Sequence, residues 1–283
     1  MYEEIIYEVG DPVATLAFNR PHALNAFTNR TLAELRHALA AAEADERVVG
    51  IVITGTGRGF SAGMDMNALA DMSSGGGGGG GGGGNSSATR ALLQANPGDP
   101  AMGANFADTF TYLLAVRKPV LAAINGACAG LGLCIALLTD IRFAERQAKF
   151  TTAFSQRGLI AEHAASWILP RLIGSSRALD LLWSARKFDG EEAVRLGVAD
   201  RLCDTGASVA AAQQYIRELA ASASPTSLKV MKQQVYRHLN VPLGEAMAES
   251  NRLMAESLKR DDFKEGVQSF MQRRPPNFPR IKG

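Results

Sequence analysis

The stretch NGACAGLGLCIALLTD, residues 125–140, decides how this chain is expected to fold. It follows an apolar run, and its glycines precede an apolar helical stretch, so a helix N-terminus with free backbone N–H groups should open here. A second segment, GTGRGFSAGMDM at 55–66, also follows an apolar run, and its glycines permit a tight turn close to a ligand. Each loop by itself is an ordinary strand-to-helix turn. Brought together, two such strand ends predict an oxyanion hole.

Strand and helix patterns surround these two loops. Residues 3–18 alternate apolar and polar positions about a central turn, which predicts a β-hairpin. The apolar runs at 50–55 and 119–126 end in glycine and are typical of buried parallel strands. Helices are predicted over 28–44 and near 105–117. Strands that alternate with helices indicate an α/β fold.

The second half of the chain has a different character. After about residue 160 the pattern is helical, apart from a short predicted strand, VADRL, at 198–202. The segment 206–283 predicts three or four helices and is treated as a C-terminal region, distinct from a core over 1–205.

A run of ten glycines occupies 75–84 and is flanked by serines and an asparagine. Such a run cannot offset its ordering entropy by burial, so the segment 73–90 is expected to be a mobile surface loop. It lacks the set glycine spacing and the Lys-Ser/Thr of a phosphate-binding loop.

The composition excludes several classes of protein. The chain has 283 residues, is 46% hydrophobic and carries 30 basic and 28 acidic residues, so a full core is expected and no nucleic acid or membrane partner is indicated. Three cysteines form neither a disulfide framework nor a metal template, which favours a reducing compartment. The N-terminus lacks the pattern of a signal peptide, and the longest apolar stretch, 127–138, is too short to span a bilayer. We therefore expect a cytoplasmic protein.

Over nearly its whole length the sequence resembles the crotonase superfamily, the enoyl-CoA hydratases and isomerases. The motifs that carry this resemblance are NRPHALNAF (19–27), GFSAGMD (59–65), INGACAGLG (124–132), TDIRFA (139–144), AKF (148–150), RGL (157–159), LPRLIG (169–174) and EGVQSF (265–270). The resemblance implies a spiral of ββα units, a C-terminal helical region used in trimerisation, and assembly as a homotrimer or a dimer of trimers. It also implies an acyl-CoA substrate, with no metal and no further cofactor.

The resemblance assigns the oxyanion hole to two main-chain donors. The thioester oxygen would lie between the backbone N–H groups of Met64 and Leu131. Such a hole stabilises the enolate that forms when a proton leaves the α-carbon or when a nucleophile adds at the β-carbon.

The acid–base groups depart from the hydratase pattern. Hydratases of this superfamily use two glutamates, and the corresponding positions here hold Cys134, expected to be an inert core thiol, and Phe154, expected to line the pocket. Glu162 remains, in a place similar to that of the single catalytic glutamate of 3,2-enoyl-CoA isomerases, although Ala161 replaces a proline found there. We expect Glu162 to shuttle a proton, in an apolar setting that includes Phe154, Ile160 and Trp167.

The remaining predictions are the following. The resemblance places CoA along His22, Ala23, Leu24 and Ala62, and adds Phe270 and Arg273 from a neighbouring subunit, although the basic tail at 273–274 is equally well explained as a solvated surface. His163 is expected at the rim or in a structural role, because adjacent helical residues do not share a face, but the alternative that it reaches the pocket stays open. Asp65 and Asp140 are expected to cap loops or to pair with arginines such as Arg58 and Arg142.

Alternative functions stay open at this point. They are hydration of a 2-enoyl-CoA, another reaction of the superfamily such as thioester hydrolysis or dehalogenation, and an acyl-CoA-binding scaffold without catalysis.

Overall fold

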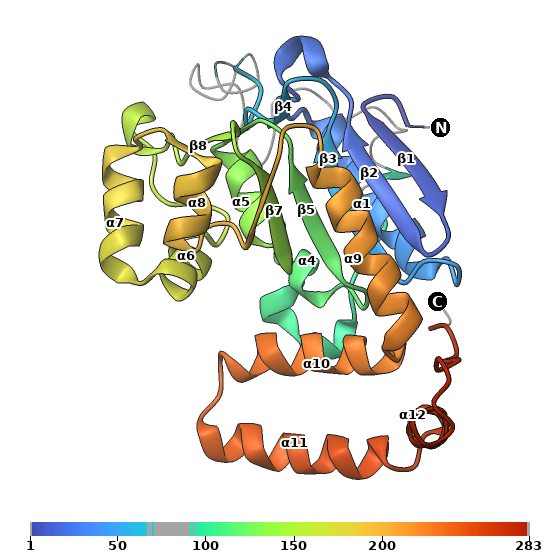
Figure 1. Ribbon diagram of the computed structural model, residues 1–283. Coiled ribbons are helices and arrows are strands. Elements are labelled where there is room, and N and C mark those ends of the chain that lie inside the picture. The colour runs from blue at the N-terminus through green and yellow to red at the C-terminus, as the bar shows by residue number, and fades with distance from the viewer. Residues whose placement is uncertain (1, 67–69, 71–90, 93, 282–283) are drawn as a thin grey trace.

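Two parallel layers of strands form the core of the computed structural model, which describes residues 2–66, 70, 91–92 and 94–281 (Figure 1). The larger sheet has six strands in the order β1 (Ile5–Gly10), β2 (Val13–Phe18), β3 (Gly50–Gly55), β5 (Val120–Ile124), β7 (Ile141–Glu145) and β10 (Arg201–Cys203). The smaller sheet has the order β4 (Gly59–Ser61), β6 (Ala127–Ala129), β8 (Lys149–Thr151) and β9 (Phe188–Asp189).

Successive pairs of strands divide between these two sheets. β3, β5 and β7 lie in the large sheet, and β4, β6 and β8, which follow them directly along the chain, lie in the small one. Helix α5 (Leu131–Leu137) follows the pair β5–β6, which completes a ββα unit. The repetition of this unit is the crotonase-type spiral expected from the sequence.

Alternation along the central strands explains how both faces of the large sheet are covered. Ile51 and Ile53 of β3 pack in one apolar cluster with helix α1 (Asn29–Ala44), whereas Val52 packs in another with helix α9 (Ser208–Ser222). Successive side chains of a strand point to opposite faces, so an unbroken apolar run requires a helix on each side. Figure 1 shows α9 crossing one face of this sheet.

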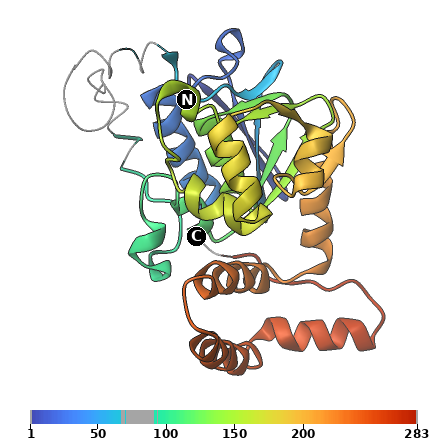
Figure 2. The same cartoon turned by 90° about the vertical axis from the view of Figure 1, so that its left-hand side faces the viewer.

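Three further helices form an arm that extends from the core (Figures 1 and 2). They are α10 (Pro225–His238), α11 (Leu243–Ser257) and α12 (Asp261–Met271). Asp140 anchors α10 to the core by accepting hydrogen bonds from Lys232 Nζ at 2.8 Å and from the Tyr236 hydroxyl at 2.9 Å. Because α9 packs on the sheet, the arm itself starts at α10, and the division at 205/206 stays a prediction.

Three shorter helices lie at one side of the core, next to the small sheet (Figure 1). They are α6 (Ala165–Ile173), α7 (Ser175–Ser184) and α8 (Gly190–Leu196). The expected hairpin, the helix over 28–44 and the two buried strands are confirmed. The predicted glycine loop at 73–90 lies wholly outside the described residues.

Two predictions of secondary structure were only partly right. The helix near 105–117 is replaced by a 3₁₀ turn at Ala104–Phe106 and the short helix α4 (Tyr112–Ala115). The chain turns between them, where the Asp108 carboxylate accepts a hydrogen bond from the amide of Thr109 and so competes with a helical bond. The strand expected at 198–202 forms at Arg201–Cys203 instead.

The close contact between α5 and β4 yields a first prediction. A Cβ atom at Gly132 would lie 2.6 Å from the carbonyl oxygen of Ser61. Gly132→Ala should therefore lower the free energy of unfolding by about 1–3 kcal/mol, the usual cost of overpacking a core, which denaturant titration would measure. Gly10→Ala is the matched control, since no atom lies within 4 Å of a Cβ added there. Equal stability of the two variants would contradict the close contact.

Candidate active site

Two loops meet where β4 and β6 end. After β4, Gly63 adopts a left-handed φ of 95° and Met64 forms an isolated parallel bridge with Phe27. After β6, Gly130 has a φ of 50° and α5 begins at Leu131. A Cβ added to Gly63 would lie 3.4 Å from the nitrogen of Leu131, so the two loops are in van der Waals contact. Glycine is required at position 63 for its φ and for this approach.

The amides of Met64 and Leu131 are left without backbone partners in the described part of the chain. Leu131 is the first residue of its helix, where the N–H group has no carbonyl in the preceding turn. In the bridge with Phe27, the hydrogen bonds are made by Phe27 to Gly63 and by Asp65 to Phe27, and Met64 donates none. Two adjacent free donors can bind one oxygen that carries negative charge.

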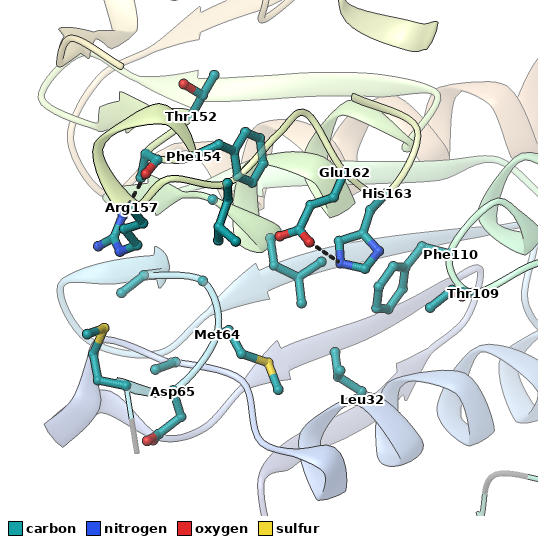
Figure 3. A pocket seen from close by; sticks show the side chains of 18 of the residues that line it. Leu32, Met64, Asp65, Thr109, Phe110, Thr152, Phe154, Arg157, Glu162 and His163 are labelled. Carbon is teal, nitrogen blue, oxygen red and sulfur yellow. Dashed lines mark hydrogen bonds and ion pairs between the residues drawn. The ribbon is translucent and has the colours of Figure 1, made fainter. Parts of the chain in front are cut away.

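A cavity of about 870 Å³ lies against these loops (Figure 3). Its lining brings together six of the residues predicted from the sequence, namely Ala23, Ala62, Met64, Leu131, Phe154 and Glu162. Thr109, Phe110, Arg157 and His163 also line it. Apolar side chains dominate the lining, which suits an acyl chain.

Four other predicted residues do not line this cavity. His22 is exposed, Leu24 borders a second hollow, and Phe270 and Arg273 are exposed at the end of the arm. The last two were expected to serve a neighbouring copy of the chain, so their role stays a prediction.

Glu162 lies in a non-helical segment before α6 and points into the cavity (Figure 3). Its side chain is 40% exposed, and its Oε2 lies 3.6 Å from Nε2 of His163. The apolar setting expected around it was partly wrong: Phe154 lines the cavity, but Ile160 is 82% exposed and Trp167 packs against the Arg171 guanidinium. Ile160 lies in a segment, residues 159–162, that forms neither helix nor strand.

His163 lines the cavity, which is the alternative to the rim position that the sequence favoured. Its ring lies in the cavity wall with its centroid 5.0 Å from that of Phe110. His163 and Ala164 both have left-handed φ values, 51° and 62°, so Glu162 and His163 can face the same cavity although they are adjacent. The residue types His and Ala give no signal in the sequence for two consecutive left-handed conformations.

Cys134 is a core thiol, as expected. It is 1% exposed, its Sγ donates a weak hydrogen bond to the Glu162 carbonyl at 3.7 Å, and burial raises the pKa of the thiol to about 12. Cys134 therefore holds the backbone of Glu162 and stays neutral.

Asp65 pairs with an arginine, as expected, and the Asp140 carboxylate accepts a hydrogen bond from the amide of Val120 at 2.7 Å, although the arginines named from the sequence are not their partners. Asp65 pairs with Arg20 at 3.0 Å and not with Arg58, while Asp140 pairs with Lys232. Arg142 is bound instead to Asp200 at 2.8 Å. Partners far apart in sequence are set by the spiral and not by proximity along the chain.

The described residues offer neither a metal centre nor a membrane-spanning helix. Among them, no group of three or more His, Cys, Asp or Glu side chains is placed to hold a metal ion. None of the described helices combines the length and apolar character needed to cross a membrane.

The spiral of ββα units, with two free amides facing an apolar cavity, defines the crotonase class of acyl-CoA enzymes. The family model described as enoyl-CoA hydratase/isomerase matches residues 8–77 and 89–280, and the chain belongs to this family. It is an enzyme of the enoyl-CoA hydratase/isomerase type.

Individual relatives match over almost their full length. The 1,2-epoxyphenylacetyl-CoA isomerase of Escherichia coli (strain K12) is 32% identical over 98% of this chain and 99% of its own. A probable enoyl-CoA hydratase of Rhodobacter capsulatus is 30% identical over 98% of each chain. The crystal structure of a probable enoyl-CoA hydratase/isomerase from Mycobacterium abscessus has a TM-score of 0.82 at 26% identity, covering 98% of this chain and 99% of that one.

The burial of the thiols yields a second prediction. At pH 8 a thiol with a pKa of about 12 is ionised in roughly one molecule in 10⁴, so Cys134 should not react with a thiol reagent in the folded protein. Cys128 is fully buried, whereas Cys203 is partly exposed. We expect slow labelling of Cys203 in the native state, its loss in Cys203→Ser, and reaction of the other two thiols on unfolding. Labelling of Cys134 in the native protein, identified by peptide mass spectrometry, would contradict this burial.

Proposed function

We propose that this enzyme converts 3-enoyl-CoA to 2-enoyl-CoA by a 1,3-proton shift, with Glu162 as the proton shuttle. One observation carries the proposal. Two carboxylates line the described cavity, and the Oδ2 atom of Asp65 is occupied by the Arg20 guanidinium, whereas Glu162 forms its nearest ion pair with the imidazole of His163. Glu162 is thus the carboxylate available to accept a proton from a substrate.

The proposed reaction needs a single carboxylate. Glu162 removes a proton from C2 of the 3-enoyl thioester, and the electron pair moves to the thioester oxygen, giving a dienolate. The amides of Met64 and Leu131 hold that oxygen. Protonated Glu162 then returns the proton at C4, the double bond moves to C2–C3, and the carboxylate is regenerated.

The groups at the other two acid–base positions support isomerisation over hydration. Cys134 is buried and neutral, and Phe154 offers no polar atom, so neither can position an attacking water as a second carboxylate would. The relatives do not decide this point, since one is named an isomerase and others are named probable hydratases.

We also propose that the CoA moiety runs along the N-terminal loop, past His22, Ala23 and Leu24, to Ala62. Phe270 and Arg273 of a neighbouring copy would complete the site in a homotrimer or a dimer of trimers. The apolar surface of the arm supports this assembly: α11 buries no residue within one chain, and large apolar side chains are exposed along it and α12, namely Met247, Met254, Phe263, Phe270 and Met271.

Replacement of the proposed base yields a third prediction. Glu162→Gln keeps the shape and hydrogen bonding of the side chain but cannot accept the proton, so kcat for 3-enoyl-CoA isomerisation should fall by roughly 10² or more with little change in acyl-CoA affinity. Glu8→Gln, on the exposed face of β1, is the matched control. Brisk hydration of 2-enoyl-CoA by the wild type that survives Glu162→Gln would overturn both the reaction and the residue.

The oxyanion hole yields a fourth prediction. Gly63→Ala would place a methyl group 2.8 Å from the Ala129 carbonyl oxygen and force the Met64 and Leu131 amides apart. We expect turnover to fall by roughly 10²–10³, the usual effect of losing one oxyanion donor. Gly103→Ala is the control, because Gly103 has a similar φ of 91° but no atom within 4 Å of an added Cβ. Equal activity of the two variants would remove Met64 and Leu131 from the proposed hole.

A further inference from the structure

The proposed base has a neighbour that can act on it. Glu162 Oε2 and His163 Nε2 lie 3.6 Å apart, and Figure 3 shows both side chains on the same wall of the cavity, with Phe110 beside the imidazole. The distance slightly exceeds a hydrogen bond, and a small side-chain rotation closes it. The side chains of Glu162 and His163 are 40% and 28% exposed, so neither is locked away from the substrate space.

The backbone holds this pair in place. The carbonyl of Glu162 accepts hydrogen bonds from the amide of Ala165 at 2.9 Å and from the Cys134 thiol at 3.7 Å. The next two residues, His163 and Ala164, are both left-handed, a conformation that costs free energy for residues other than glycine. Such strain persists only where its surroundings impose it, and here it turns the imidazole toward the carboxylate.

The packing around His163 leaves its Nε2 side to Glu162. One edge of the ring meets Phe110, which is 5% exposed. The charged group that faces His163 from the loop before α4 is Asp108, whose pKa is lowered chiefly by hydrogen bonds from Thr109 and more weakly by the charge of His163. The imidazole therefore lies between the apolar ring of Phe110 and the carboxylate of Glu162.

We propose that His163 is a positioning residue that donates its Nε2–H to Oε2 of Glu162 and directs Oε1 toward the substrate. This inference rests on the proposed function. While Glu162 carries the proton taken from C2, the donor on Oε2 keeps that proton on Oε1, facing the dienolate. The proton then returns to C4 of the same substrate instead of exchanging with water along the exposed side of the carboxyl group.

A matched pair of variants tests this step. His163→Gln retains an N–H donor of similar reach, whereas His163→Leu removes it, and both carry the same strain at a left-handed position. We expect His163→Leu to lower kcat by roughly 10- to 10²-fold with little change in KM, and His163→Gln to recover most of that loss. In D₂O, His163→Leu should also place more deuterium at C4 of the product than the wild type, as NMR would show.

Two further measurements separate the possible failures. In a Glu162→Gln background, His163→Leu should have no further effect on kcat, because His163 acts through Glu162. His238→Gln, which alters the other His–Glu pair, His238 and Glu249 at 3.2 Å, should leave kcat and deuterium incorporation unchanged. If His163→Leu does not fold, His163→Asn replaces it, since asparagine tolerates the left-handed region and does not reach the Nε2 position.

The outcomes are distinct. Wild-type kcat and wild-type deuterium incorporation in His163→Leu, with Glu162→Gln inactive, would overturn the role of His163 and leave the proposed function standing. Full activity of Glu162→Gln would overturn the proposed function first. Additive losses in the double variant would show that His163 only supports the fold, and would also overturn the inference.

Discussion

The structure depends on one constraint: backbone packs directly against backbone between neighbouring turns of the spiral, where no side chain fits. A Cβ atom at Gly126 would lie 2.1 Å from the Arg58 carbonyl oxygen, and one at Gly132 would lie 2.6 Å from that of Ser61. These contacts set the spacing between the ends of β4 and β6, and therefore the distance between the amides of Met64 and Leu131. Backbone that packs directly on backbone leaves little room for movement. The proposed oxyanion hole requires such stiffness, because its donors must be in place before the negative charge develops.

Much of this fold could be predicted because its signals are local. The alternation of Ile51, Val52 and Ile53 between two apolar clusters follows from the period of a strand. The glycines that follow each apolar strand predict the turns. The predicted helix near 105–117 was only partly right because its apolar spacing looked helical, while the Asp108 side chain offered the backbone a competing hydrogen bond. Ion pairs such as Arg20 with Asp65 join residues 45 positions apart, and no local pattern contains them.

The site could be predicted in part for the same reason. Met64, Leu131 and Glu162 do share one cavity, since each follows a recognisable turn. The direction of His163 could not be predicted, because it depends on two consecutive left-handed residues, His163 and Ala164. A helical interpretation of this segment put the side chains of Glu162 and His163 on different faces. Ile160, which was expected beside Glu162, is instead 82% exposed.

The two carboxylates of the cavity are distinguished by the cations beside them. Asp65 is held by Arg20, which also reaches Glu4 at 3.5 Å and the carbonyl of Ala26, so this network ties the Met64 loop to the N-terminal segment. A guanidinium stays charged throughout and can only fix geometry. Glu162 faces an imidazole, which can donate a hydrogen bond without a permanent charge. One wall of the cavity is therefore held by a fixed ion pair and the opposite wall carries a carboxylate beside an imidazole, and the proposed 1,3-proton shift would use the first to hold the thioester oxygen and the second to move the proton.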